Sequence, residues 1–96
     1  MIARSRRVTV APDQIDDILI QYRASVPPIH AAALGLRQHD ILVDRQARTI
    51  EIIGLWNSPE AINAIASELE PARAGLWTAF GQPPLLKIFD VADELP

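Results

Sequence analysis

Residues 50–62, IEIIGLWNSPEAI, contain an abrupt change from a buried strand to a helix. The first half is rich in β-branched isoleucine, which favours a strand. Ser58 then offers an N-cap oxygen and Pro59 suits the first helical position. Alternation along the strand places Gly54 and Trp56 on one face, so that Gly54 leaves a space beside Trp56. That space suits either a ligand or another side chain.

The β pattern extends on both sides of this stretch. The five residues 44–48 form a short polar turn, so the strands that flank it should pair as an antiparallel hairpin. Near the N-terminus, Arg4 and Arg6 continue the face of Val8 and Val10, so the start of that strand is expected to reach solvent. Strands are predicted at residues 3–10, 36–43, 49–56 and 85–91.

Two helical regions lie between these strands. The first opens at Pro12 and ends before Pro27-Pro28, where proline disfavours a helix. The second is predicted at residues 58–69, with Pro71 interrupting it before a further helical piece at 72–80. Gly81 should stop that piece. The first helix has one apolar stripe at helical spacing, formed by Ile15, Ile18, Leu19 and Tyr22.

The resulting order, β-α-β-β-α-β, predicts an α+β, ferredoxin-like fold with a four-stranded antiparallel sheet and both helices on one face. The other sheet face is then left bare, and it is expected to carry Ile53, Leu55, Leu86 and Ile88. Hydrophobic residues make up 49% of the chain, which is high for its length. Because an exposed apolar face marks an interface, we expect a homodimer formed sheet to sheet.

Length and composition exclude several classes of protein. The 96 residues predict a single domain over 1–96. A net charge of −3, with one basic run at residues 4–7, gives no reason to expect a nucleic-acid partner. No apolar run approaches the ~20 residues of a membrane span, so no membrane partner is expected either. The absence of cysteine rules out a thiolate nucleophile and fits a reducing compartment. Arginines also interrupt any apolar signal-peptide core near the N-terminus, so a cytoplasmic location is expected.

His39 and Asn57 are the candidate catalytic residues. His39 lies in the middle of a strand with Arg37 on its own face, and it can act as a general base whose pKa the nearby cation lowers. The alternative is an ordinary hydrogen-bonded strand histidine. Asn57 can donate its amide to an oxyanion, or it can simply suit the turn. His30 is expected in a loop, and two histidines without a repeated spacing predict no metal site.

The aromatic side chains are candidates for binding a planar substrate. Trp56 can stack on an aromatic ring, and Trp77 can complete an aromatic slot with it. Tyr22 and Phe80 complete the candidate substrate-binding residues together with Arg37. Each aromatic residue has a structural alternative: Trp56, Tyr22 and Phe80 as core residues, and Trp77 at a subunit contact.

The strand end Leu55-Trp56, the helix start at residues 57–61 and Gly35 at the head of the second strand together resemble the antibiotic biosynthesis monooxygenase family. The resemblance implies a dimeric α/β barrel. Members of that family include cofactor-independent oxygenases of polycyclic phenols, haem-degrading enzymes and lactone isomerases. The haem-degrading branch places a histidine ligand in the last helical segment. Residues 72–80 contain none, so haem is not expected. The sequence carries no flavin or metal signature either, so no cofactor is expected.

Two functions from different classes remain open. In the first, the protein is a cofactor-free monooxygenase or isomerase that acts on an aromatic or phenolic small molecule. His39 takes the substrate proton, Asn57 stabilises the oxyanion, and Trp56 with Trp77 holds the rings. In the second, the protein is a non-catalytic, dimeric small-molecule-binding or interaction module of the same fold. A large closed cavity at His39 or Asn57 would favour the enzyme, and a filled core would favour the module.

Overall fold

The computed structural model describes residues 1–26, 35–80 and 84–93, and for residues 78–80 it describes the backbone alone. His30 with its predicted loop, the helix stop at Gly81 and the side chain of Phe80 lie outside the described residues. The elements in chain order are β1 (Ile2–Thr9), a 3-10 turn η1 (Pro12–Gln14), α1 (Ile15–Ser25), β2 (Leu36–Asp44), β3 (Thr49–Trp56), α3 (Pro59–Asn63), α4 (Ala66–Phe80) and β4 (Leu85–Asp90).

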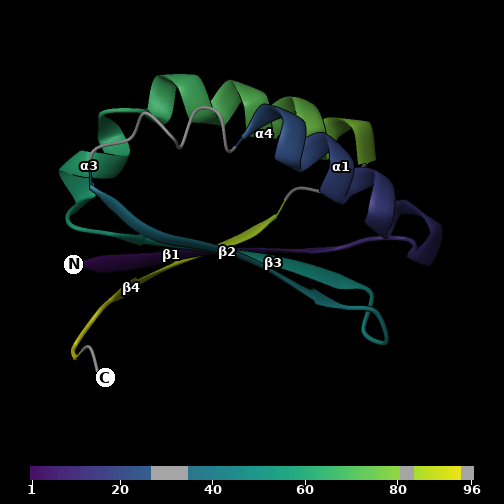
Figure 1. Cartoon of the computed structure of the whole chain (residues 1–96), viewed down its shortest axis with the longest axis horizontal. Helices are drawn as coiled ribbons and strands as arrows, with labels where there is room; N and C mark the ends of the chain where they lie inside the picture. Colours follow the sequence, from purple (N-terminus) through teal and green to yellow (C-terminus); the bar gives the residue numbers. More distant parts are fainter. Residues whose placement is uncertain (27–34, 81–83, 94–96) are drawn as a thin grey trace.

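The four strands form one antiparallel sheet in the order β2-β3-β1-β4. Helices α1, α3 and α4 all lie over the same face of this sheet, and the opposite face is bare (Figure 1). This arrangement confirms the predicted α+β, ferredoxin-like fold. Among the described residues, no helix is both long enough and apolar enough to cross a membrane.

The corner between β3 and α3 forms as its sequence predicts. The Ser58 hydroxyl oxygen accepts a hydrogen bond from the Ala61 backbone N–H at 3.3 Å, and Pro59 occupies the first turn. The Asn57 backbone N–H donates to the Gly35 carbonyl at 2.8 Å. Gly35 has a φ of +111°, and a Cβ there would lie 2.7 Å from Cβ of Ala61. Glycine is therefore required for the chain to enter β2 beside this corner.

The predicted interruption at Pro71 is wrong, because α4 runs continuously through it. The break comes earlier, between α3 and α4, where the Ile65 N–H bonds the Ile62 carbonyl at 3.1 Å in a tight turn. Pro71 removes one backbone donor and is itself exposed. Leu69 and Leu76, on either side of it, are buried against the core, and this packing holds the helix together.

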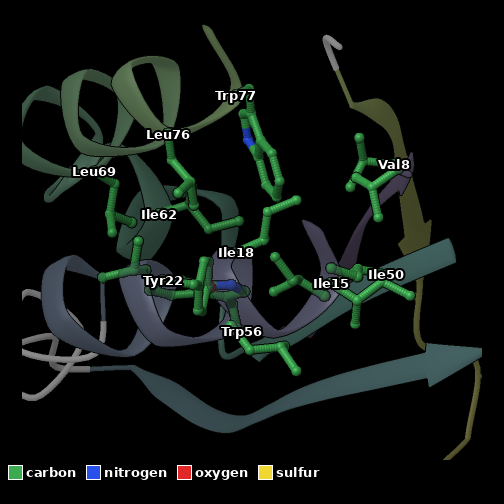
Figure 2. Close-up of a cluster of buried hydrophobic side chains, with 14 of the residues drawn as sticks. Val8, Ile15, Ile18, Tyr22, Ile50, Trp56, Ile62, Leu69, Leu76 and Trp77 are labelled. Atoms are coloured by element: carbon green, nitrogen blue, oxygen red, sulfur yellow. The ribbon is translucent and has the colours of Figure 1, made fainter. Parts of the chain in front are cut away.

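The core fills the space between the helices and the covered sheet face (Figure 2). The apolar stripe predicted for α1 is confirmed, since all four of its members are buried. Trp56 enters the core from the sheet and Trp77 descends from α4 at a separate position. The largest fully buried side chains are Trp56, Tyr22, Ile15, Ile18, Ile50, Leu69 and Val26.

The expectation that Arg4 and Arg6 reach solvent is wrong. Strand β1 is central in the sheet, and its helix-side residues lie beneath α4 rather than at an edge. Only 9% of the Arg4 side chain and 10% of the Arg6 side chain are exposed.

The predicted composition of the bare sheet face is partly wrong. In the observed register Leu86 pairs with Arg6 and Ile88 with Arg4, so both belong to the helix-side face. The β4 residues on the bare face are instead Leu85, Lys87 and Phe89, the partners of Arg7, Ser5 and Ala3. The placement of Ile53 and Leu55 on the bare face is confirmed by their pairing with Ser5 and Ala3.

Candidate functional site

His39 and Tyr22 are joined by a hydrogen bond beneath the helices. The Tyr22 hydroxyl lies 2.7 Å from Nε2 of His39, and the two ring centroids are 5.7 Å apart with a tilt of 52°. Tyr22 closes the apolar stripe of α1 and is 1% exposed. His39 pairs with Gly54 across β2 and β3, so its imidazole points to the same helix-side face.

The surroundings of His39 keep its imidazole neutral. Partial burial lowers the pKa of His39 below its usual 6.5, the charge of Arg73 lowers it further, and Asp40 acts in the opposite direction. The cation that acts on His39 is therefore Arg73 on α4, and the expectation that Arg37 has this role is wrong. A β-bulge between residues 36 and 38 breaks the alternation at Arg37, whose guanidinium lies 3.3 Å from Sδ of Met1.

The lowered pKa of His39 predicts an acid-sensitive fold. The unfolded chain takes up a proton at His39 near pH 6.5, whereas the folded protein takes it up only at a lower pH. The free energy of unfolding is therefore unaffected above about pH 6.5 and decreases as the pH drops from about 6.5 toward the pKa of His39 in the folded protein. The melting temperature should therefore fall between about pH 7.5 and about pH 5, and His39→Gln should lose less over the same range. Equal losses in the two proteins would contradict this origin of the acid sensitivity.

Three arginines and one glutamate lie next to this pair, and we call them the arginine cluster: Arg4, Arg6, Glu70 and Arg73. Oε1 of Glu70 lies 2.8 Å from Nη2 of Arg4, 2.7 Å from Nη2 of Arg6 and 3.9 Å from Nη1 of Arg73. Arg4 and Arg6 are two residues apart on β1, and Glu70 and Arg73 are one turn apart on α4, so each pair shares a face. Arg73 is 5% exposed.

The cluster remains positively charged at neutral pH. Burial, together with the charges of Arg4 and Arg73, lowers the pKa of Arg6 to about 10, which still leaves it protonated. Burial and Arg73 likewise lower the pKa of Arg4. Burial raises the pKa of Tyr22, while the charge of Arg73 and its hydrogen bond to Tyr22 act the other way. The site therefore combines a neutral imidazole, a protonated phenol and charged guanidiniums.

The space beside Gly54 is largely filled by Trp56. A Cβ on Gly54 would lie 2.7 Å from Nε1 of the Trp56 indole, and Trp56 is 2% exposed. A volume of about 10 Å³ remains, roughly enough for one water molecule. It is lined by Arg4, Arg6, Ile52, Gly54, Trp56 and Arg73.

This close approach predicts that Gly54→Ala is destabilising. The new methyl group would force the buried indole of Trp56 to move, and overpacking of this kind costs about 1–3 kcal/mol in the free energy of unfolding. Chemical denaturation measures the change. Gly75→Ala is the matched control, because a Cβ there meets nothing within 4 Å. A loss for Gly54→Ala no greater than for Gly75→Ala would show that the indole has room to move.

The other predicted site residues lie on several different elements of the fold. Asn57 is exposed at the corner beside Gly35. Trp77 is 5% exposed within the core, and its Nε1 finds no hydrogen-bond partner among residues 1–26, 35–80 and 84–93. Sequence reasoning missed Arg4, Arg6, Glu70 and Arg73. Within the described ranges, no three His, Cys, Asp or Glu side chains lie where they could hold a metal ion together.

No protein-family model matches the sequence, and no curated protein matches it significantly. Solved structures do match. Rv0793 from Mycobacterium tuberculosis is 18% identical with a TM-score of 0.80, covering 99% of this chain and 98% of its own. An antibiotic biosynthesis monooxygenase is 17% identical with a TM-score of 0.77, covering 97% and 100%. SnoaB, a cofactor-independent oxygenase from Streptomyces nogalater, is 19% identical with a TM-score of 0.72, covering 99% and 96%.

Matches over nearly the full length of both chains, at identities of 20% or less, establish the architecture. This chain therefore has the fold of the antibiotic biosynthesis monooxygenases.

Proposed function

We propose that the protein is a cofactor-independent monooxygenase that acts on an aromatic or phenolic small molecule. The observation that carries this proposal is the 2.7 Å hydrogen bond between Tyr22 and a neutral His39, next to the charge of Arg73. A neutral imidazole can accept a proton, and a nearby guanidinium stabilises the anion that proton loss creates. The fold shared with SnoaB, a cofactor-independent oxygenase, supports the same proposal.

In this proposal the substrate is its own reductant. The substrate gives an acidic proton to the Tyr22 oxygen while Tyr22 passes its own proton to Nε2 of His39, so that Tyr22 stays neutral throughout. The substrate anion then transfers electrons to dioxygen. When a ring methylene is oxidised to a carbonyl, one oxygen atom bonds to that carbon. The other oxygen atom leaves as water with the two methylene hydrogens.

The arginine cluster is better placed than Asn57 to stabilise the substrate anion. Arg73 bonds the Tyr22 hydroxyl and its charge acts on His39, whereas Asn57 is exposed at the corner. We therefore assign the oxyanion role predicted for Asn57 to Arg73. Trp56, whose indole borders the same small space, remains the proposed ring contact. Trp77, Arg37 and Phe80 remain proposed substrate contacts on the sequence argument alone.

Dioxygen uptake tests the function directly. The protein, exhaustively treated with a metal chelator, should consume dioxygen when supplied with anthrone or a hydroquinone, at a rate well above that of buffer alone. Heat-denatured protein serves as the blank. If no uptake is seen with a broad set of phenols and anthrones, the proposed activity is wrong.

The small volume beside Trp56 favours the second candidate, a non-catalytic small-molecule-binding module. A space of about 10 Å³ holds no aromatic ring, so a substrate enters only if Trp56 or α4 moves. Thermal-shift measurements with the same phenols separate the two candidates. A raised melting temperature without dioxygen uptake supports the module, and uptake supports the enzyme.

We also propose a homodimer formed through the bare sheet face. That face carries half-exposed Leu42 and Phe89 and a hollow of about 120 Å³ that Ile53 and Leu55 help to line. Acidic side chains lie on one side, on β2 and β3, and basic side chains on the other, on β1 and β4. A twofold axis through such a face can bring opposite charges together across the interface. These acidic and basic residues are Asp40, Asp44, Glu51, Arg7 and Lys87.

The dimer should be detectable by light scattering at micromolar concentration, because a stable interface buries more than about 1,000 Å². Phe89→Lys should shift the mass toward that of a monomer, since it places a charge on the bare face. Ile20→Lys is the matched control, because Ile20 is an exposed apolar residue on the helical layer. A wild-type protein that runs as a monomer would rule out this assembly.

A further inference from the structure

The arginine cluster has more positive than negative charge. Among the described residues, three guanidiniums surround one carboxylate, and all three ion pairs go to the same oxygen, Oε1 of Glu70. Arg4, Arg6 and Arg73 are each about nine-tenths buried or more. Burying charges without matching counter-charge is unfavourable, so the cluster favours an anion on its guanidiniums, whether the Glu70 carboxylate or that of a ligand.

Arg6 supplies a donor for such an anion. Its Nη2 bonds Glu70, whereas its Nε is buried and has no hydrogen-bond partner among residues 1–26, 35–80 and 84–93. A guanidinium offers its donors as a planar fork that matches a carboxylate, so an unfilled position on that fork favours a carboxylate ligand. Arg6 also lines the small space beside Trp56, together with Arg4 and Arg73.

Glu70 differs from its partners in exposure. Half of its side chain is exposed, whereas the arginines it bonds are buried. Its carboxylate therefore reaches the cluster from the solvent side and can turn away into water without breaking the core. The position of Glu70 thus indicates that these arginines bind a carboxylate, and that a ligand carboxylate would approach them from the solvent side.

We infer that the arginine cluster binds the carboxylate of an aromatic acid, with Glu70 holding that position when no ligand is bound. The ligand carboxylate replaces the Glu70 carboxylate on Arg4 and Arg6, and its ring lies toward Trp56 and Gly54. Because the space that these residues line is only about 10 Å³, Trp56 or α4 must move to admit the ring. This inference deepens the proposed function, on which it rests for placing the ring beside Tyr22 and His39. It adds a carboxylate to the aromatic or phenolic substrate of the proposed function.

Calorimetric titration of the wild-type protein gives the first test and needs no turnover. We expect 2-naphthoate to bind at least about tenfold more tightly than its neutral counterpart 2-naphthamide. Hydrogen bonds to a charged acceptor are stronger than those to a neutral one by an amount that corresponds to about tenfold in affinity. Inorganic phosphate should bind more weakly than 2-naphthoate, because it offers no ring. Equal affinity for the acid and the amide, or for the acid and phosphate, would overturn the inference.

Two variants should act in opposite directions. Glu70→Gln removes the internal carboxylate and should tighten 2-naphthoate binding by about tenfold, whereas Arg6→Gln should weaken it by about tenfold. Arg7→Gln is the matched control, since Arg7 is the next residue on β1 but belongs to the bare face and pairs with Glu51. Unchanged affinity in Glu70→Gln would mean that Glu70 is purely a structural ion-pair partner.

The binding experiments test the carboxylate site and the dioxygen-uptake experiments test the oxygenase, so either proposal can be refuted without the other. Dioxygen uptake with neutral phenols, together with no preference for 2-naphthoate, removes the carboxylate site and leaves the oxygenase. Selective 2-naphthoate binding without dioxygen uptake under any condition removes the oxygenase and supports the carboxylate site.

Discussion

Replacing His39 by alanine should lower the rate of dioxygen uptake by about 10²–10⁴-fold, the usual contribution of a positioned general base. The expected loss follows from the position of Nε2, 2.7 Å from the Tyr22 hydroxyl, and from the lowered pKa that keeps the imidazole neutral. Initial rates on an oxygen electrode, with the same chelated substrate solution for each variant, measure the effect.

Two further variants show whether proton transfer is the reason. His39→Gln keeps a polar group that can hydrogen-bond Tyr22 but cannot take up the proton, so its loss should match that of His39→Ala. Tyr22→Phe keeps the buried ring and removes the hydroxyl, so it should also reduce the rate. Uptake unchanged in His39→Ala would remove His39 from the mechanism.

Replacing Trp56 by alanine should destabilise the fold by about 3–5 kcal/mol, as large aromatic truncations in cores do. Trp56 is 2% exposed, ends the β3 strand and fills the space beside Gly54, so its removal leaves a cavity that the core cannot easily close. Chemical denaturation gives the free energy of unfolding.

Trp56→Phe retains part of the buried ring and should lose clearly less stability than Trp56→Ala. A loss under about 1 kcal/mol for the alanine variant would mean that Trp56 contributes little to the core. Its role would then be better explained by ligand binding.

Local signals predicted most of the fold because they agreed with each other. The strand boundaries at β3 are those expected, and the Ser58 cap and the α1 stripe form as predicted. Each depends on residues close together in sequence: a cap within three residues, a stripe within eight. The sheet order then follows from the β-α-β-β-α-β sequence of elements.

Features that depend on tertiary context were missed. β4, with the sequence LLKIFD, has apolar residues on both faces, so its pattern could not define its register. Pro71 is tolerated because Leu69 and Leu76 are buried around it, which no local helix rule describes. Arg37 was placed beside His39 by strict alternation, which the bulge at residues 36–38 breaks.

Only part of the candidate site could be predicted, because the rest depends on contacts between elements that are distant in the sequence. His39 and Tyr22 were each chosen from their own elements, but their contact joins β2 to α1 across seventeen residues of sequence. From the sequence alone, Arg4 and Arg6 are expected to be exposed to solvent at the start of a strand. Their burial follows only from the central position of β1 in the sheet, beneath α4. The available signal was that Arg4 and Arg6 continue the valine face of β1. Glu70 and Arg73 complete the cluster from a distant helix.

Mass spectrometry of the product formed under ¹⁸O₂ tests the proposed monooxygenase activity most directly. With chelated protein and anthrone as the substrate, we expect one labelled oxygen atom in each product molecule and the second in water. The labelled product should form slowly in His39→Ala. A product that carries no ¹⁸O, or one that forms equally fast in His39→Ala, would contradict the proposed chemistry.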